Sequence, residues 1–137
     1  MENQRLLLPG AFVVADNVLK PGAALFLWRL IKSSAYDVEI VCLKEFAMHS
    51  KDWMSISVLK SQCEDDTFCV VPRPPKELFQ LEKEADGMRA QATGVGGVES
   101  EKWAAFAEDM EARLELYGIA STHTYGVRDG SFHNHIR

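Results

Sequence analysis

The feature that most constrains the fold of this chain is a short apolar run, Ala11 to Ala15, with the sequence AFVVA. A Pro-Gly pair precedes the run, and Asp16 and Asn17 end it. A β-branched run without polar alternation is typical of a strand that is buried on both faces of a largely parallel sheet. We therefore predict a central strand over residues 11–15. The polar pair falls at its carboxyl end, the edge of an open α/β sheet where ligands usually bind.

The residues that follow continue an α/β pattern. Apolar residues in Ala23–Ser33 recur at spacings of three, four and seven, which predicts an amphipathic helix. Tyr36–Leu43 and Trp53–Leu59 each alternate between two sets of side chains, which predicts two strands. Residues 44–52 join these strands, and their number suits an antiparallel hairpin with a wide loop. We expect about three strands in total, the last two forming the hairpin.

A change in composition divides the chain between residues 63 and 75. Three consecutive acidic residues there are followed by Pro72, Pro74 and Pro75, and proline disfavours both helices and central strands. Residues 1–60 carry a charge balance of +1, whereas residues 61–137 carry −6. We therefore predict a sheet portion over residues 1–62, an acidic and Pro-rich linker over 63–75, and a helical acidic extension with a flexible tail over 76–137.

Two helices are predicted in the extension. Residues 76–92 place apolar side chains at helical spacing, and Gly94 ends that pattern. A second amphipathic helix begins with Ser100 as its cap and stops at Gly118. Ser121–Arg137 has no sustained period and is predicted to be extended tail or loop. Because three strands offer too little surface to bury both helices, we expect one helix face to dock on another protein.

Composition also excludes several classes of protein. A net charge of −5 lacks the basic field that binds nucleic acid, and no window approaches the roughly 18 apolar residues of a membrane span. Peripheral association with a membrane complex stays compatible with both observations. The three cysteines, Cys42, Cys63 and Cys69, are odd in number and lack CxxC spacing, so we expect them to be reduced. Residues 1–5 show no signal peptide, which favours a cytoplasmic or plastid (stromal) location over secretion.

The stretch from residue 7 to residue 60 resembles the C-terminal part of the catechol O-methyltransferase family. It contains, in order, LLPGAFVVADNVLKPGAALFLWRL, EIVCLKEF and DWMSISVLK. The most specific element is the strand, then the four residues ADNV, then a Pro-Gly pair and a helix. The resemblance implies an S-adenosylmethionine-dependent, Rossmann-like α/β fold of seven strands whose last two form an antiparallel hairpin. We expect a truncated version of that sheet with a helical C-terminal extension.

The resemblance also implies three site residues. Asp16 and Asn17 match positions where the family places two ligands of its Mg²⁺, and Glu45 matches the acidic residue that hydrogen-bonds a catechol hydroxyl. Mg²⁺ prefers hard oxygen ligands, and the bound metal lowers the pKa of the substrate hydroxyl. The alternative interpretation is structural. Asp16 and Asn17 then form a polar strand end or Asx turn without a metal, and Glu45 is a solvated hairpin residue.

The elements that the resemblance leaves unmatched argue against catalysis by this chain alone. In the family, the glycine-rich cofactor loop, the acidic residue that binds the cofactor ribose, the third metal-ligating Asp and the catalytic Lys precede the strand that residues 11–15 match. Only ten residues precede it here. No catalytic residue is assigned, and we expect no cofactor for the chain alone. Mg²⁺ and S-adenosylmethionine belong to the alternative of an O-methyltransferase whose N-terminal half is missing.

The sequence therefore predicts a non-catalytic, methyltransferase-derived module that acts as a structural or accessory subunit of a larger assembly. In the family a further strand pairs with the strand matched by residues 11–15, so protein partners are expected to cover that open edge and the helical tail. The residues around Trp103 to Gly118 resemble long-tailed members of the family from dinoflagellate-type algae. That resemblance makes a plastid photosystem with its antenna a candidate host. A free-standing regulatory binding module has no positive feature in its favour.

Overall fold

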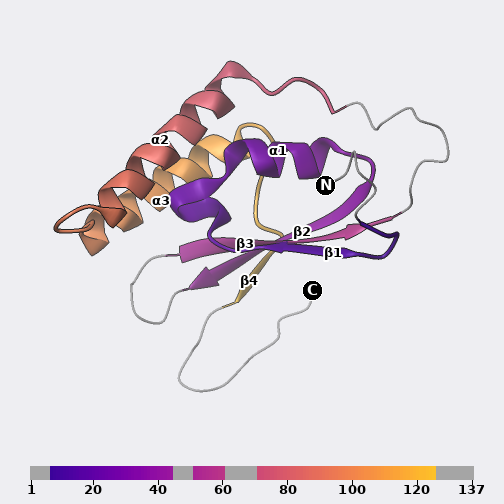
Figure 1. The fold of residues 1–137 in the computed structure, drawn as a ribbon, viewed down its shortest axis with the longest axis horizontal. Helices are drawn as coiled ribbons and strands as arrows, with labels where there is room; N and C mark the ends of the chain where they lie inside the picture. The colour runs from indigo at the N-terminus through magenta and orange to yellow at the C-terminus, as the bar shows by residue number, and fades with distance from the viewer. Residues whose placement is uncertain (1–6, 45–50, 61–70, 126–137) are drawn as a thin grey trace.

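The computed structural model describes residues 7–44, 51–60 and 71–125 and shows an α/β fold with a four-stranded mixed sheet (Figure 1). The strand order is β1-β3-β2-β4, in which β3 is antiparallel to β1 and β2, and β4 is parallel to β2. Such a sheet with helices is compatible with a Rossmann-like fold. No helix within the described ranges is long and apolar enough to cross a membrane. The elements are β1 (Phe12–Ala15), η2 (Val18–Gly22), α1 (Ala24–Lys32), β2 (Tyr36–Lys44), β3 (Lys51–Leu59), α2 (Lys76–Thr93), α3 (Ser100–Glu115) and β4 (His123–Tyr125).

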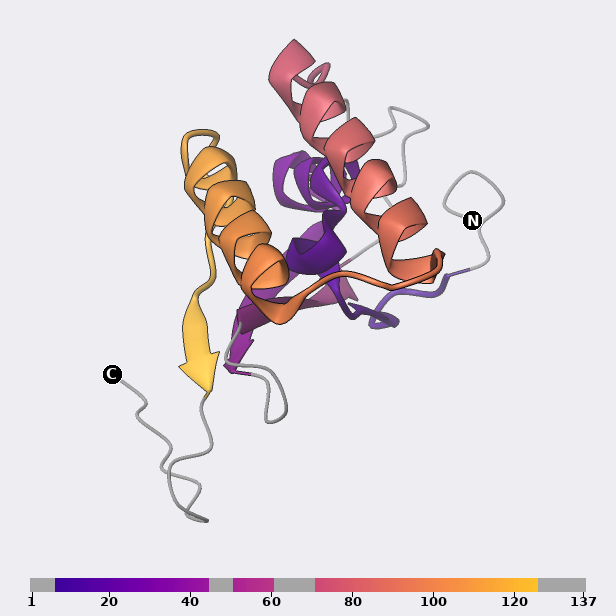
Figure 2. The same cartoon turned by 90° about the vertical axis from the view of Figure 1, so that its left-hand side faces the viewer.

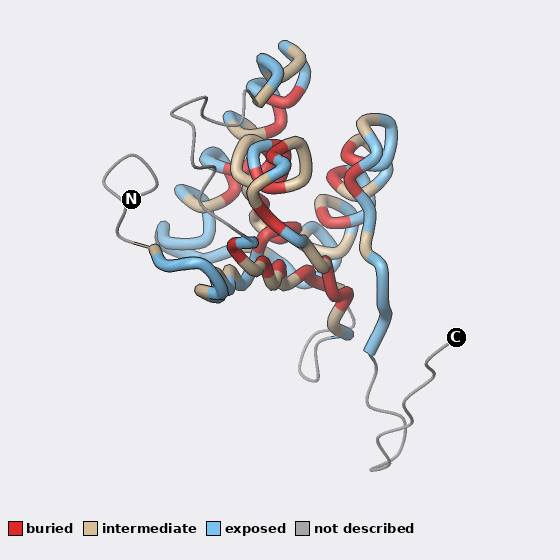
Figure 3. Tube along the Cα trace, turned by 90° about the vertical axis from the view of Figure 1, so that its right-hand side faces the viewer, coloured by how far each residue is buried: buried red, intermediate tan, exposed pale blue. Residues whose placement is uncertain are grey.

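The helices lie together on one face of the sheet, as Figures 1 and 2 show from two directions. The strand positions that point toward them are the odd-numbered residues of β1 and β3 and the even-numbered residues of β2. Three of these on the central strand, Trp53, Ser55 and Ser57, are fully buried. In Figure 3 buried positions recur where the helices face the sheet. We call this side the covered face and the opposite side the open face.

The prediction that residues 11–15 form a central strand buried on both faces is wrong. β1 lies at the end of the strand order and pairs with β3 alone among the described residues. Phe12 is 70% exposed and Val14 is 58% exposed, and both point to the open face. An apolar run does not reveal which strand will lie beside it. Here β3 returns antiparallel between β1 and β2 and takes the central position.

The predicted hairpin is confirmed, but the predicted total of about three strands is one short of the four in the sheet. β2 and β3 pair over their whole lengths, from Tyr36 opposite Leu59 to Lys44 opposite Lys51. The fourth strand, β4, lies in the segment that was predicted to be extended tail or loop. Its three residues pair with Val41–Leu43 of β2, and the preceding Thr122 donates both its N–H and its hydroxyl to the carbonyl of Ile40. These long-range bonds, not local periodicity, define the strand.

Both helices of the extension bury their apolar faces on the sheet portion, so the expectation that the sheet is too small for them is wrong. One hydrophobic cluster contains residues from both sides of the predicted linker. The sheet portion contributes a turn and a helix as well as strands, which increases the surface available for packing. The fully buried members of this cluster are Leu19, Leu27, Trp53, Leu78, Leu81, Ala85, Ala107, Leu114 and Ile119.

Of the two predicted ends of α3, the C-terminal one is confirmed and the N-terminal cap is wrong. Gly118 is confirmed as the stop, because its φ of 72° is left-handed and its N–H donates to the carbonyl of Glu115 at 2.9 Å. Ile119 N–H donates to the carbonyl of Leu114 at 3.2 Å, which completes a Schellman motif. The predicted Ser100 cap is wrong. Glu99 occupies the cap position without a side-chain hydrogen bond, and its carbonyl accepts from the N–H of the fourth residue along.

Candidate functional site

Asp16 and Asn17 lie where the sequence predicted, at the carboxyl end of β1, and both are exposed. The Oδ1 atom of Asp16 accepts a hydrogen bond of 2.9 Å from the N–H of Asn17. Asn17 itself has left-handed backbone angles, φ 58° and ψ 34°, which asparagine tolerates better than most residues. The pair therefore forms a sharp polar corner between the strand and the turn η2.

This corner has few oxygen atoms that could bind a metal ion. Carboxylate and amide oxygens suit Mg²⁺, which also requires near-octahedral coordination. Within the described ranges, no group of three or more His, Cys, Asp or Glu side chains is placed to hold a metal ion. Asp16 and Asn17 could supply two ligands, and water or substrate oxygens would have to complete the shell. Glu45, the third residue implied by the resemblance, lies outside the described residues.

A buried carboxylate, Asp52, holds the turn that follows the corner. Its Oδ1 atom accepts from the backbone N–H of Lys20 at 3.0 Å and from that of Trp53 at 2.7 Å. Asp52 is only 3% exposed and comes from the beginning of β3. No sequence pattern singled out this residue. The sequence shows only that an aspartate begins a predicted strand and that a tryptophan follows it. The role of Asp52 depends on its hydrogen bond with Lys20, which lies 32 positions away.

Helix α2 provides polar groups to the same segment. The Oε2 atom of Glu82 accepts from the N–H of Leu25 at 3.1 Å, at the start of α1, where no side chain of α1 itself caps the helix. A carboxylate at this end also interacts favourably with the helix dipole. Arg89 Nη2 donates to the carbonyl of Gly22. The extension thus completes the hydrogen bonding of the segment that follows Asp16.

Gly22 is the point of closest approach between this segment and the extension. Its φ of +107° favours glycine, and a Cβ atom there would lie 3.1 Å from Cε of Met110 and 3.7 Å from Cβ of Ala85. Both helices of the extension therefore contact the same turn. A side chain at this position would require the end of the Met110 side chain to move by a few tenths of an ångström.

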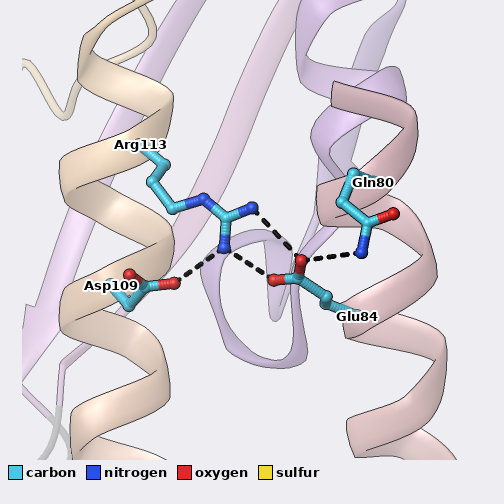
Figure 4. A network of polar contacts seen from close by, with 4 residues as sticks. All are labelled: Gln80, Glu84, Asp109 and Arg113. Atoms are coloured by element: carbon cyan, nitrogen blue, oxygen red, sulfur yellow. Dashed lines mark hydrogen bonds and ion pairs between the residues drawn. The ribbon is translucent and has the colours of Figure 1, made fainter. Parts of the chain in front are cut away.

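An ion-pair network joins the two helices of the extension (Figure 4). Arg113 of α3 donates to both carboxylate oxygens of Glu84 on α2, through Nη1 at 2.6 Å and Nη2 at 3.2 Å. Arg113 also donates to Asp109, and Glu84 accepts from Gln80. The hydrogen bonds from Arg113 hold the pKa of Glu84 below its usual value, and Glu84 raises the pKa of Arg113. This network fixes the helices relative to one another.

Cys42 and Trp53 are directly opposite on β2 and β3 and belong to the core. Burial is the main cause that raises the pKa of the Cys42 thiol, and the nearby Glu111 carboxylate adds to it. Glu111 forms an ion pair with Lys51, which in turn has a raised pKa. A thiol with a raised pKa is a poor nucleophile at neutral pH. Cys42 is therefore a packing residue.

The comparisons with known proteins return nothing that could identify this site. No family model, no curated protein and no solved structure matches the chain. The α/β fold and the corner at Asp16 and Asn17 are therefore the observations from which a function has to be inferred.

Proposed function

We propose that the chain is a non-catalytic, methyltransferase-derived module that serves as a structural or accessory subunit of a larger protein assembly. The candidate host is a plastid photosystem with its antenna, on the basis of the sequence resemblance alone. The observation that carries the structural role is β1, a short apolar strand whose outer edge has no strand beside it among the described residues. Native sheets usually cover or charge such an edge, so a protein partner is the expected occupant.

The hydrogen bonding at the corner supports the non-catalytic role. Asp16 accepts from its own neighbour, and Asn17 completes the turn through its carbonyl, which accepts from Gly22 N–H at 3.4 Å. Asp52 then stabilises the turn by accepting a hydrogen bond from the N–H of Lys20. These contacts give both residues a local structural task that needs no metal ion.

The extension is the second partner surface of this proposal. Its core-facing side chains are buried, but Phe79 on α2 is 48% exposed and Leu116, just after α3, is 79% exposed. A partner that binds the helical tail would contact these outward-facing apolar residues. Phe79→Lys and Leu116→Lys should weaken such binding without unfolding the chain.

Calorimetric titration of the whole chain with S-adenosylmethionine and, separately, with Mg²⁺ tests the non-catalytic role. We expect no micromolar binding of the methyl donor, because no described residue forms a site for it. We also expect only weak binding of Mg²⁺, since two protein ligands rarely hold this strongly hydrated ion. Micromolar binding of S-adenosylmethionine would overturn the proposed role.

The alternative, a catechol-type O-methyltransferase with a missing N-terminal half, predicts a different result. Mixing the chain with a complementing methyltransferase half should then restore methyl transfer to a catechol. Asp16→Ala should abolish the restored activity by removing the charged metal ligand, whereas Glu45→Gln should weaken substrate orientation. A restored activity that neither substitution changes would refute the residue assignments made from the resemblance.

A further inference from the structure

Three of the large exposed apolar residues of the described chain lie within seven positions of one another. Leu8 is 72% exposed, Phe12 is 70% exposed and Val14 is 58% exposed. We call them the β1 patch. Single exposed apolar residues are ordinary on protein surfaces, but two on β1, with Leu8 shortly before the strand, favour a contact surface. The other exposed members are dispersed over the molecule: Phe79, Val95, Leu116 and Tyr125.

The outer edge of β1 also has backbone donors and acceptors that can pair with another strand. Leu59 N–H donates to the carbonyl of Ala11 at 3.0 Å, so the backbone groups of Ala11, and by alternation of Val13 and Ala15, point toward β3. Those of Phe12 and Val14 therefore point outward, away from the sheet. The residues with exposed side chains are thus the same residues that present outward-facing donors and acceptors.

The edge of β1 lacks the usual protection against pairing. Between Ala11 and Ala15 it has no charged residue, no proline and no bulge in its register with β3. At the opposite side of the sheet, β4 covers part of β2, and Nδ1 of His123 on β4 lies 3.0 Å from Oε1 of Glu39 on β2. Among the described residues, one edge is therefore partly covered and polar, while the other is apolar and has no strand beside it.

We propose that two copies of this chain pair through their β1 strands, antiparallel about a two-fold axis that passes beside Val13. The two four-stranded sheets then form one continuous sheet with both helix layers on the same face. This interface rests on the proposed function, because it identifies the partner that covers β1. The helical extension remains available to other components of an assembly.

The register of β1 explains why a second copy fits this edge. With Val13 on the axis, Phe12 of one copy lies opposite Val14 of the other, and the pair occurs twice. Both members are outward-facing, so each pair exchanges two backbone hydrogen bonds, and aromatic pairs with β-branched residues are favourable across strands. An axis at Phe12 would place Val14 opposite Gly10. An axis at Val14 would place Phe12 opposite the carboxylate of Asp16.

Charge complementarity supports the same register. It places Asp16 of one copy opposite Gly10 of the second copy, so no like charges face one another. Gly10 lies beside the end of β3, where its N–H donates to the carbonyl of Leu59 and Lys60 follows. Asp16 and Lys60 both belong to the open-face set of positions, since Lys60 pairs with Asp37 there at 2.7 Å. Lys60 and the opposing Asp16 are two strand spacings of about 4.8 Å apart, a separation that an extended lysine side chain and the carboxylate bridge together.

The mass of the whole chain in solution tests this interface. Light scattering and sedimentation should show the mass rising with concentration from 15.4 kDa toward twice that value. The contact is smaller than a standard interface, so concentration dependence is expected. A mass that stays monomeric up to about 1 mM, the limit of weak specific association, would overturn the proposal.

Paired variants locate the interface. Phe12→Lys combined with Val14→Lys should weaken dimerisation at least about tenfold, because like charges then face one another across the axis. Ala92→Lys combined with Val95→Lys is the matched control, since it adds the same two charges at exposed residues outside the β1 patch. Circular dichroism should show that all variants remain folded. A dimer that the double variant leaves unchanged would refute pairing through β1.

Cysteine cross-linking tests the register. Val13 occupies the non-hydrogen-bonded position on the axis, where opposing Cβ atoms lie about 4.5–5.5 Å apart. In a background in which Cys63 and Cys69 are serine, Val13→Cys should form a disulfide-linked dimer on mild oxidation. Ala15→Cys should not, because its opposite residue is Ala11 of the second copy. Equal cross-linking of the two variants would refute this register.

These outcomes separate the interface from the proposed function. A strictly monomeric chain that neither binds the methyl donor nor restores methyl transfer refutes the dimer and leaves the structural role in place. Restored methyl transfer with a complementing half refutes the structural role, whatever the mass of the isolated chain. A chain that dimerises and does not bind S-adenosylmethionine in the calorimetric titration supports both the interface and the structural role.

Discussion

The two faces of the sheet are built from the same strands but differ in how far their side chains are buried. On the covered face, Trp53 is fully buried beneath three helices, whereas on the open face Phe12 of the neighbouring strand is 70% exposed. Open-face polar side chains pair across strands, as Lys60 does with Asp37 and His123 does with Glu39. Substitutions on the covered face should therefore change the stability of the fold, and substitutions on the open face should change association.

The largest expected effect contrasts two aromatic residues on opposite faces. Trp53→Ala should lower the free energy of unfolding by about 3–5 kcal/mol, because it leaves a cavity between the sheet and the helices. Phe12→Ala should change it by about 0.5 kcal/mol or less, as is usual for exposed positions. Urea denaturation followed by fluorescence and circular dichroism measures both. Similar losses would show that the open face is covered within a single chain.

The second prediction extends the covered face to the helical extension. Leu81→Ala on α2 should cost about 2–5 kcal/mol, since Leu81 is fully buried in the cluster that contains Leu19 and Leu27. Phe79→Ala on the same helix is the control, because its ring is 48% exposed. A cost below about 1 kcal/mol for Leu81→Ala would indicate that the extension does not share the core of the sheet.

The third prediction concerns the network between α2 and α3. Because the pKa of Glu84 is lowered in the folded state, its contribution to stability is present above the ordinary value of 4.5 and is lost as the pH falls below it. Glu84 and Arg113 are each about one-third exposed, so screening limits the contribution to about 1 kcal/mol.

Urea denaturation of Glu84→Gln therefore has a pH-dependent result. The variant should be less stable than the parent chain at pH 7, and the difference should disappear below the lowered pKa of Glu84. Glu115→Gln removes an exposed carboxylate of α3 and is the matched control. A difference that persists unchanged in strong acid would mean that packing, and not charge, accounts for the effect of Glu84.

The smallest expected effect concerns the serines of the covered face. The hydroxyls of Ser55 and Ser57 are fully buried, and neither has a hydrogen-bond partner among the described residues. Ser55→Ala should therefore stabilise the chain by up to about 1 kcal/mol. Ser100→Ala should be nearly neutral, because no side-chain hydrogen bond caps α3. Destabilisation by Ser55→Ala would indicate that a buried water satisfies the hydroxyl.

Local periodicity was sufficient for the helices and the hairpin but not for the position of β1. The bounds of α1 and α2 agree with the predicted ranges within one or two residues. An apolar run such as Phe12–Ala15, by contrast, carries no period-2 signal, so it cannot show that one face will be exposed. That outcome depends on β3 and on helices encoded more than sixty residues later.

The candidate site was predictable to a similar extent. The position of Asp16 and Asn17 at a strand end followed from the sequence, because the end of an apolar run marks the end of a strand. The roles of Asp52 and Glu82 did not follow, since each accepts from a backbone N–H that is distant in sequence. Such contacts leave no periodic signal, and only the fold brings the partners together.

Glu82 of α2 caps α1, and this contact cannot form until α2 has been synthesised. Translation proceeds from the N-terminus, so residues 7–60 leave the ribosome before α2 and α3 exist. During that interval the start of α1 lacks its carboxylate, Gly22 lacks the guanidinium of Arg89, and the covered face is open to solvent. At about 5–20 residues per second, this exposure lasts for several seconds. The nascent chain therefore exposes the apolar side chains of its covered face until α3 has emerged.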